Sequence, residues 1–185
     1  MERNRTITHP INGDKITFLK TCAETKGKST LCEMEVFANA QGTSAAPLHY
    51  HNCYTETFTV IEGELTVTIG KETLTLKKGE TATVPLKALH SFSNKTTQSV
   101  KATIEVQPGH EGFENSLYIL YGLATDGKSD KTGFPNSKSH LAILMLMADT
   151  RFSGFMSLIM PIMKVIAKRA IKKGVEKELI DRYCK

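Results

Sequence analysis

The sequence predicts a mainly β protein, a barrel or sandwich of short strands followed by a C-terminal α-helical segment. From residue 15 to residue 107, apolar and polar residues alternate in short runs, a pattern typical of strands with one buried face. Turns containing Gly63, Gly70 and Gly79 separate several of these runs. After Pro108-Gly109 the apolar residues recur at helical spacing instead. The chain has 185 residues, enough for one domain with an appendage.

The first part of the chain contains the expected strands. Cys32, Met34 and Val36 alternate with two glutamates, and the later runs use threonine at the positions expected to face solvent. Threonine suits such positions because its β-branched side chain fits an extended backbone. Residues 1–13 are expected to form an arm or a first edge strand. The expected strands cover residues 15–20, 31–37, 56–60, 65–69, 73–76, 82–84, 90–92 and 100–106.

The second part, residues 108–185, is expected to be a helical extension packed on the barrel of residues 1–107 or on a partner chain. A first helix is expected around residues 113–124, followed by a turn-rich loop over residues 126–139. Two apolar runs follow, Leu141–Met147 and Phe152–Met163. Gly174 is expected to end a basic helix, and a last short helix would cover residues 175–184.

Charge is concentrated in the tail. The formal net charge is +5, and residues 161–185 hold eight of the 24 Lys and Arg but three of the 19 Asp and Glu. The tail therefore accounts for the whole net charge. Nucleic-acid binding is not expected, because no aromatic residue interleaves with the basic run Lys168–Lys173.

The apolar runs do not predict a membrane span. Asp149, Arg151 and Lys164 interrupt them, and neither run reaches the ~18–20 residues that a crossing helix needs. We expect this surface to be buried in a homodimer. The alternative is an amphipathic basic helix that makes peripheral contact with a membrane surface.

The cysteines indicate a reduced, cytoplasmic setting. None of the four cysteines forms a CxxC pair, and the N-terminus lacks the apolar core of a signal peptide. Cys53 lies among the candidate ligands described next. It could be a further ligand or a redox-sensitive thiol, but a small buried residue in a turn is favoured.

The candidate chemistry lies in the stretch LHYHNCYTE, residues 48–56. His49 and His51 are two residues apart, so in a strand both imidazoles point to the same face and can reach one ion. Glu56 can join them only if the chain turns at residues 52–54. A second stretch, Gly79–Asn94, supplies His90. Such ligands suit Zn, Fe, Cu, Ni or Mn without choosing among them; the alternative is that these are ordinary strand residues.

Together the two stretches resemble the motifs of the cupin superfamily. His49, His51, Glu56 and Gly63 fit the first motif, G-x5-H-x-H-x3,4-E-x6-G, and Gly79, Pro85, His90 and Asn94 fit the second, G-x5-P-x-G-x2-H-x3-N. Two positions depart from the motifs: Gly42 is one residue too far from His49, and Lys87 replaces the inner glycine of the second motif. The resemblance implies an RmlC-like jelly-roll barrel, a double-stranded β-helix, with a divalent metal on His49, His51, Glu56 and His90.

The resemblance also implies a small-molecule ligand, and two classes of function follow. The first is a metal-dependent enzyme with dioxygenase-like oxygen chemistry, in which Glu56 could also act as a base. The second is a non-catalytic metal or small-molecule binder, such as a sensor or storage protein. Met34, Phe58, Val60 and Phe92 could line its pocket or be plain barrel core, and Asn94 is expected to hold a turn.

Overall fold

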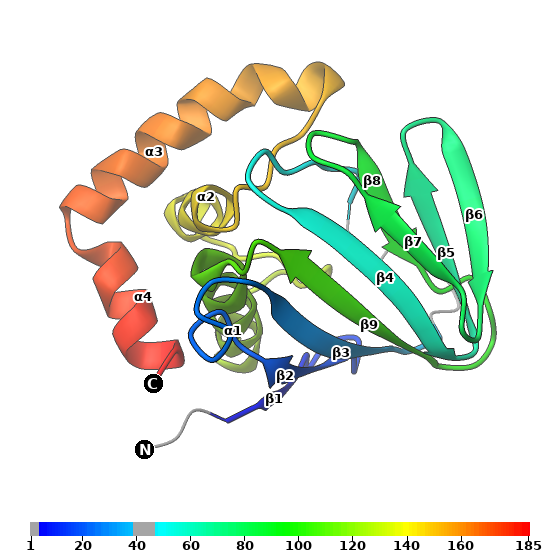
Figure 1. The fold of residues 1–185 in the computed structure, drawn as a ribbon. Helices are drawn as coiled ribbons and strands as arrows, with labels where there is room; N and C mark the ends of the chain where they lie inside the picture. Colours follow the sequence, from blue (N-terminus) through cyan, green and yellow to red (C-terminus); the bar gives the residue numbers. More distant parts are fainter. Residues whose placement is uncertain (1–3, 39–46) are drawn as a thin grey trace.

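Two antiparallel sheets enclose one core in the computed structural model, which describes residues 4–38 and 47–185. Gly42 lies outside these described residues. The larger sheet has the order β1-β2-β3-β9-β4-β7 and the smaller one β6-β5-β8 (Figure 1). The strands are β1 (Thr6–Thr8), β2 (Lys15–Lys20), β3 (Thr30–Val36), β4 (Thr55–Glu62), β5 (Glu64–Ile69), β6 (Glu72–Lys77), β7 (Thr81–Val84), β8 (His90–Ser93) and β9 (Val100–Gln107). The predicted jelly-roll-like β fold with a helical C-terminal segment is confirmed.

Residues that alternate between apolar and polar in the sequence lie on the inner and outer faces of the sheets. Every second residue is buried in β3, in β9 and in β4 as far as Val60, because successive side chains of a strand point to opposite faces. Phe58 of β4 and Val67 of β5 are fully buried and belong to the same core. This shared apolar core holds the two sheets together.

The outer face of the sheets carries threonine pairs. Thr57 lies opposite Thr83 and Thr59 opposite Thr81, and in each pair the hydroxyl oxygens are 3.0 Å apart. Cross-strand pairs of this kind stabilise a sheet by a few tenths of a kcal/mol each. The threonine-rich positions therefore add to strand pairing although they bury little surface.

One expected core position is exposed. Leu74 alternates with polar residues as Leu76 does, yet 39 % of Leu74 is accessible and 6 % of Leu76. Its strand, β6, forms one edge of the smaller sheet. A side chain on an edge strand is covered from fewer sides, so alternation predicts its face but not its burial.

The helical segment begins on the barrel itself. Helix α1 (Glu111–Thr125) places Phe113, Tyr118 and Tyr121 in the barrel core. The Glu114 carboxylate accepts hydrogen bonds from the backbone N of Cys22 and the Oγ1 of Thr30, at 2.5 and 2.6 Å. Helix α1 is thus packed on the barrel by apolar contact and fixed by a buried carboxylate.

The remaining helices build a second apolar core against the outer side of α1. They are α2 (Lys138–Met147), the 3-10 helix η1 (Gly154–Ile159), α3 (Met160–Lys172) and α4 (Val175–Tyr183). Ile119 and Leu123 of α1 meet Ile143 and Leu144 of α2, Ala170 of α3 and Leu179 of α4. Gly174 joins α3 to α4 with φ 85°, the left-handed conformation that glycine adopts without strain.

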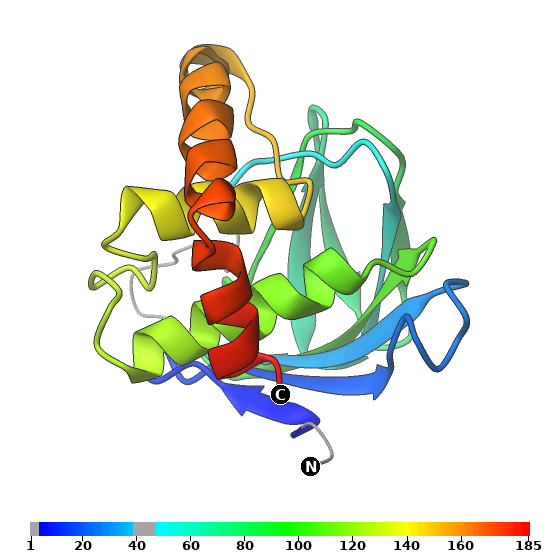
Figure 2. The same cartoon turned by 90° about the vertical axis from the view of Figure 1, so that its left-hand side faces the viewer.

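Helix α3 runs along the outside of this helical layer (Figures 1 and 2). Ala167 and Ala170 are its buried residues. The apolar run that continues into it from Phe152 is largely exposed, with Phe155 and Leu158 the most accessible of the large apolar residues. No helix in the described residues is long and apolar enough to cross a membrane.

Candidate metal centre

The four predicted ligands come from three separate backbone segments that meet between the sheets. His49 and His51 lie just before β4, Glu56 lies in β4, and His90 begins β8. The backbones of His49 and His90 pair, with N–O distances of 2.9 and 2.8 Å. The chain bends at Asn52 and Cys53, as the odd spacing of Glu56 requires. The fold therefore brings together residues that lie 34 to 41 positions apart.

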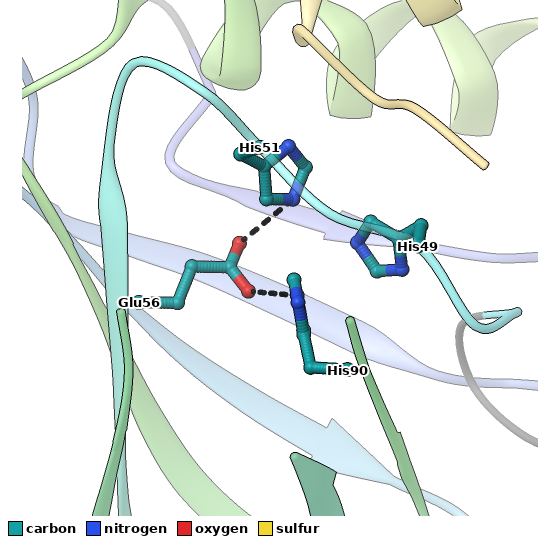
Figure 3. Close-up of side chains that lie close together, drawn as sticks. All are labelled: His49, His51, Glu56 and His90. Carbon is teal, nitrogen blue, oxygen red and sulfur yellow. Dashed lines mark hydrogen bonds and ion pairs between the residues drawn. The ribbon is translucent and has the colours of Figure 1, made fainter. Parts of the chain in front are cut away.

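The four side chains converge on one point. One ligand atom from each of His49, His51, Glu56 and His90 lies within 4.8 Å of the others, and all four residues are buried. Glu56 Oε2 is 2.9 Å from His90 Nε2, and Glu56 Oε1 is 3.7 Å from His51 Nε2 (Figure 3). This group could hold a metal ion.

Each imidazole is oriented by a backbone carbonyl. The Nδ1 atoms of His49, His51 and His90 lie 2.6, 3.2 and 3.0 Å from the carbonyl oxygens of Pro47, Asp149 and Ala88. A carbonyl oxygen can only accept a hydrogen bond, so each Nδ1 carries a proton and donates it. The three Nε2 atoms are left for the centre of the cluster, which is the arrangement that metal-binding histidines use.

Charge in the cluster is distributed unevenly. Burial lowers the pKa of His49 to about 4, helped by neighbouring His90, and burial also lowers the pKa of His51. Burial is the largest single influence on His90 and would lower its pKa, but the hydrogen bond and charge of Glu56, with the Ala88 carbonyl, together outweigh burial and raise it. At Glu56 burial is also the largest single influence and would raise the pKa of the carboxyl, but the His90 hydrogen bond and the three neighbouring imidazoles together outweigh burial and lower it. In the metal-free cluster these shifts favour a proton on His90 next to an ionised Glu56, and they favour the neutral form of His49 and His51.

The residues present fit a divalent transition metal. Nε2 of His51 is buried and has no hydrogen-bond partner among the described residues, which costs free energy unless another group satisfies the atom. Three imidazoles and one carboxylate are ligands that Zn, Fe, Cu, Ni and Mn accept. A metal ion at the centre would satisfy the unpaired nitrogen.

Asp149 is the residue near the site that the sequence did not reveal. Its carbonyl accepts from His51, and its carboxylate Oδ2 accepts from the backbone N atoms of Asn52 and Cys53 at 2.6 and 3.1 Å. The next residue back, Ala148, accepts from the Tyr54 hydroxyl at 2.7 Å. The segment after α2 thus clamps the whole turn that carries His51. The sequence shows Asp149 only as a single acidic residue after an apolar run. Nothing in the sequence indicates that it contacts Asn52 and Cys53, which lie nearly a hundred positions earlier.

Two other positions of the second motif, Lys87 and Asn94, keep the backbone roles expected there. Lys87, which replaces the inner glycine, has φ 63° and donates its backbone N–H to the His51 carbonyl at 2.8 Å. The turn therefore keeps the left-handed backbone that glycine favours, at a cost in strain. Asn94 donates to the carbonyls of Val36 and Gln98 and accepts from Thr96 N, so it holds a turn, as predicted.

Cys53 is exposed, not buried as predicted. The Asp149 carboxylate fixes the turn by accepting from the backbone N atoms of Asn52 and Cys53, and in this turn the Cys53 side chain is left on the exposed side. Partial burial and the Asp149 carboxylate raise the pKa of the thiol to about 11, which disfavours the reactive thiolate. The thiol is also not part of the four-residue cluster.

The apolar residues proposed for a pocket belong to the core. Met34, Phe58 and Val60 are at most 1 % exposed, and Phe92 packs against them. A cavity of about 400 Å³ lies instead between α2 and the η1–α3 segment, lined by Tyr50 and Asp149 among others. None of the four ligand side chains lines this cavity, so a molecule in it would lie behind the His51 turn.

Comparison with known families identifies the barrel. Residues 36–112 match the family model described as the cupin domain. The chain carries a cupin domain. The matched stretch contains all four clustered residues of this cupin, together with Lys87 and Asn94. A comparison with curated proteins finds no match.

Several solved structures are similar to the cupin domain. A "predicted oxalate decarboxylase" from Thermotoga maritima is 17 % identical, over 58 % of this chain and 98 % of that one, with a TM-score of 0.48. An RmlC-like cupin from Shewanella frigidimarina is 19 % identical, over 58 % and 86 %, with a TM-score of 0.47. An uncharacterised conserved protein with a double-stranded β-helix domain from Klebsiella pneumoniae is 23 % identical, over 56 % and 84 %, with a TM-score of 0.45.

Proposed function

We propose that this protein binds one divalent transition metal per chain through His49, His51, Glu56 and His90. We further propose that it uses the ion in dioxygenase-like chemistry on a small organic molecule. The observation that carries the proposal is the convergence of the four ligand atoms within 4.8 Å. The buried, unpaired Nε2 of His51 supports it, because that atom needs a partner.

The protein residues would have separate roles. His49, His51 and His90 would hold the ion through Nε2, oriented by their backbone carbonyl acceptors. Glu56 would supply the one negative charge of the cluster, and its carboxylate could accept a proton from a substrate. When bound, a divalent transition ion would supply a Lewis acid and, where redox-active, electrons for reaction with dioxygen.

A second candidate function is non-catalytic metal or small-molecule binding. All four ligand residues are at most 8 % exposed, and the cavity between α2 and α3 does not reach them. A closed site of this kind favours holding an ion over admitting a substrate. The fold does not separate the two functions, because function depends on the site.

Elemental analysis tests the proposed metal binding, and oxygen uptake tests the proposed dioxygenase-like chemistry. Protein purified without chelator should contain close to one transition metal per chain, and the double variant His49→Ala, His51→Ala should contain none. His140→Ala serves as the matched control, since His140 lies on α2 outside the cluster. Full metal content in the double variant would refute the site.

The proposed dioxygenase-like chemistry is tested with metal-loaded protein and a panel of enediols, flavonols, diketones and small acids. Oxygen uptake with one of them, absent in the double variant, supports the enzyme. No uptake with any metal would favour the binding protein instead.

A further inference from the structure

One surface of the molecule combines exposed apolar residues with unpaired positive charge. We call it the η1–α3 surface. Its apolar residues are Phe155, Leu158, Ile162 and Val165, which are 81, 68, 61 and 48 % exposed. Single exposed apolar residues are normal, but a contiguous group on one helical segment marks an interaction site.

Positive charge continues along the same helix. Lys164, Lys168, Arg169, Lys172 and Lys173 all belong to or directly follow α3, and all five are exposed. No Asp or Glu occurs between Asp149 and Glu176. Among the described residues none of the five forms an ion pair, whereas the basic residues of α4 pair with Asp126 or Asp181. The charge on α3 is therefore available to an external anionic partner.

The geometry of α3 directs both features outward. Ala167 and Ala170 are buried against the helical layer, so the opposite face of the helix points away from the protein. Ile162 and Val165 lie on the outward face near the start of the helix, and Lys168, Arg169 and Lys172 lie on it further along. Figure 1 shows α3 along the outer rim of the helical layer, with α2 between it and the barrel strands.

We propose that the η1–α3 surface docks on an anionic lipid membrane. Phe155, Leu158 and Ile162 would enter the boundary between head groups and acyl chains, and the basic residues of α3 would contact lipid phosphates and carboxylates. An apolar surface next to a cluster of Lys and Arg is the chemistry that such a membrane recognises. The helix lies on the membrane and does not cross it, in agreement with its length.

A second copy of the chain fits this surface less well. Four apolar side chains offer a few hundred Å² at most, below the ~800 Å² per partner of a stable protein interface. A second copy would also have to supply carboxylates for five lysine and arginine side chains, and the facing surface of a symmetric dimer carries the same positive charge. An anionic bilayer supplies both the apolar phase and the opposite charge.

The absence of tryptophan from the chain provides a direct test. Phe155→Trp introduces a single indole on the surface, and Leu74→Trp introduces one on β6 of the barrel. Vesicles of phosphatidylcholine containing phosphatidylserine should shift the Phe155→Trp emission to shorter wavelength and leave Leu74→Trp unchanged. Vesicles of phosphatidylcholine alone should shift neither.

Charge variants test the electrostatic part by vesicle co-sedimentation. The pair Lys168→Gln, Lys172→Gln should weaken binding to the anionic vesicles by about tenfold or more, from the ~1 kcal/mol that each basic residue contributes. Lys71→Gln, Lys78→Gln is the matched control, because both lysines are exposed in the turns on either side of β6 and form no ion pair within the described part of the chain. All four lysines are exposed, so both variants should fold.

Three results would overturn the proposal. The first is no sedimentation with anionic vesicles at low salt. The second is equal loss of binding in both lysine pairs, which would indicate diffuse attraction by net charge. The third is a concentration-dependent dimer that Phe155→Ser, Leu158→Ser dissociates without any vesicle binding, which would make a second copy the occupant.

Discussion

Glu56 is the residue whose chemistry separates a metal-dependent enzyme from a metal-binding protein. Its carboxylate is the one anionic group of the cluster, and it receives a hydrogen bond from His90. Three imidazoles can still hold an ion when the carboxylate is replaced. The charge at the centre then rises by one unit, and a more positive ion is harder to oxidise.

We therefore expect Glu56→Gln to keep most of its metal and to lose oxygen uptake by ~100-fold or more, the range that a positioned proton acceptor supplies. The measurement pairs elemental analysis with oxygen uptake on any substrate found, and His49→Ala, His51→Ala is the metal-free comparison. Unchanged uptake would leave an enzyme but refute the role of Glu56.

Asp149 should control metal affinity from outside the cluster. Asp149→Ala removes two hydrogen bonds to the turn that carries His51 and an ion pair with Arg151. We expect metal affinity to fall by ~10–100-fold, as for other groups that orient metal ligands. The free energy of unfolding of the metal-free protein should fall by about 2 kcal/mol.

Asp149→Asn is the matched control. Asparagine keeps a side-chain oxygen for the turn and tolerates the left-handed backbone, φ 47°, of this position. Competition with a chromophoric chelator measures the affinity, and urea unfolding measures the stability. Equal metal affinity in the wild type and in Asp149→Ala would show that the turn is held without the clamp.

The cluster of four residues could be predicted from sequence because His-x-His is a local pattern in side chains, and because the resemblance to the cupin motifs connects it with Glu56 and His90. Their orientation could not. The acceptors are the carbonyls of Pro47, Ala88 and Asp149, and every residue has a carbonyl, so nothing in the sequence marks these three.

At the scale of elements, close packing of α1 on α2 positions the Asp149 segment. A Cβ atom at Gly112 would lie 2.1 Å from the carbonyl oxygen of Met147. Real Cβ atoms do not approach other atoms below 3.0 Å, so only glycine allows this contact between the two helices. Met147 ends α2, two residues before Asp149.

Gly112→Ala should therefore push α2 away from α1. We expect the free energy of unfolding to fall by about 1–3 kcal/mol, the usual cost of overpacking, with a parallel loss of metal affinity because Asp149 moves with α2. Gly122→Ala is the comparison on the same helix, because there a Cβ atom would clash with Tyr183 at the end of α4 and not with α2. We expect Gly122→Ala to lower stability while leaving metal affinity unchanged, and equal metal affinity in the two variants would contradict a link from Gly112 to Asp149.

The strands were predictable because their alternation is set by the chain itself, whereas burial is set by neighbours. Strands β2, β3 and β9 occur where the pattern places them. Leu74 shows the limit, since the same pattern on an edge strand leaves it exposed. The apolar run that begins at Phe152 is exposed for the same reason, because apolar composition alone does not reveal whether another element covers it.

At the scale of the whole molecule, the helical segment is part of the site and of the fold. Helix α1 contributes three aromatic residues to the barrel core, and the segment after α2 holds the His51 turn. Helices α3 and α4 cover Ile143 and Leu144 of α2 in turn. The proposed metal centre thus depends on contacts from both parts of the chain.

A chain that ends after Asp149 should therefore aggregate. It loses α3 and α4 and exposes the apolar residues of α1 and α2 that they cover, which are at most 6 % exposed in the intact chain. Light scattering of the shortened and intact chains at equal concentration makes the comparison, and the intact chain also reports on the homodimer predicted from the sequence. A soluble, cooperatively unfolding monomer after the deletion would show that α3 and α4 are not needed to cover the helical core.

The most direct test of the central proposal is to locate the metal itself. Crystals of protein purified without chelator should be measured at the absorption edge of the metal that elemental analysis identifies. We predict one anomalous peak per chain, within bonding distance of the Nε2 atoms of His49, His51 and His90 and of the Glu56 carboxylate. A full-occupancy peak elsewhere in the molecule, or no peak between these four residues in crystals soaked with excess metal, would contradict the assignment.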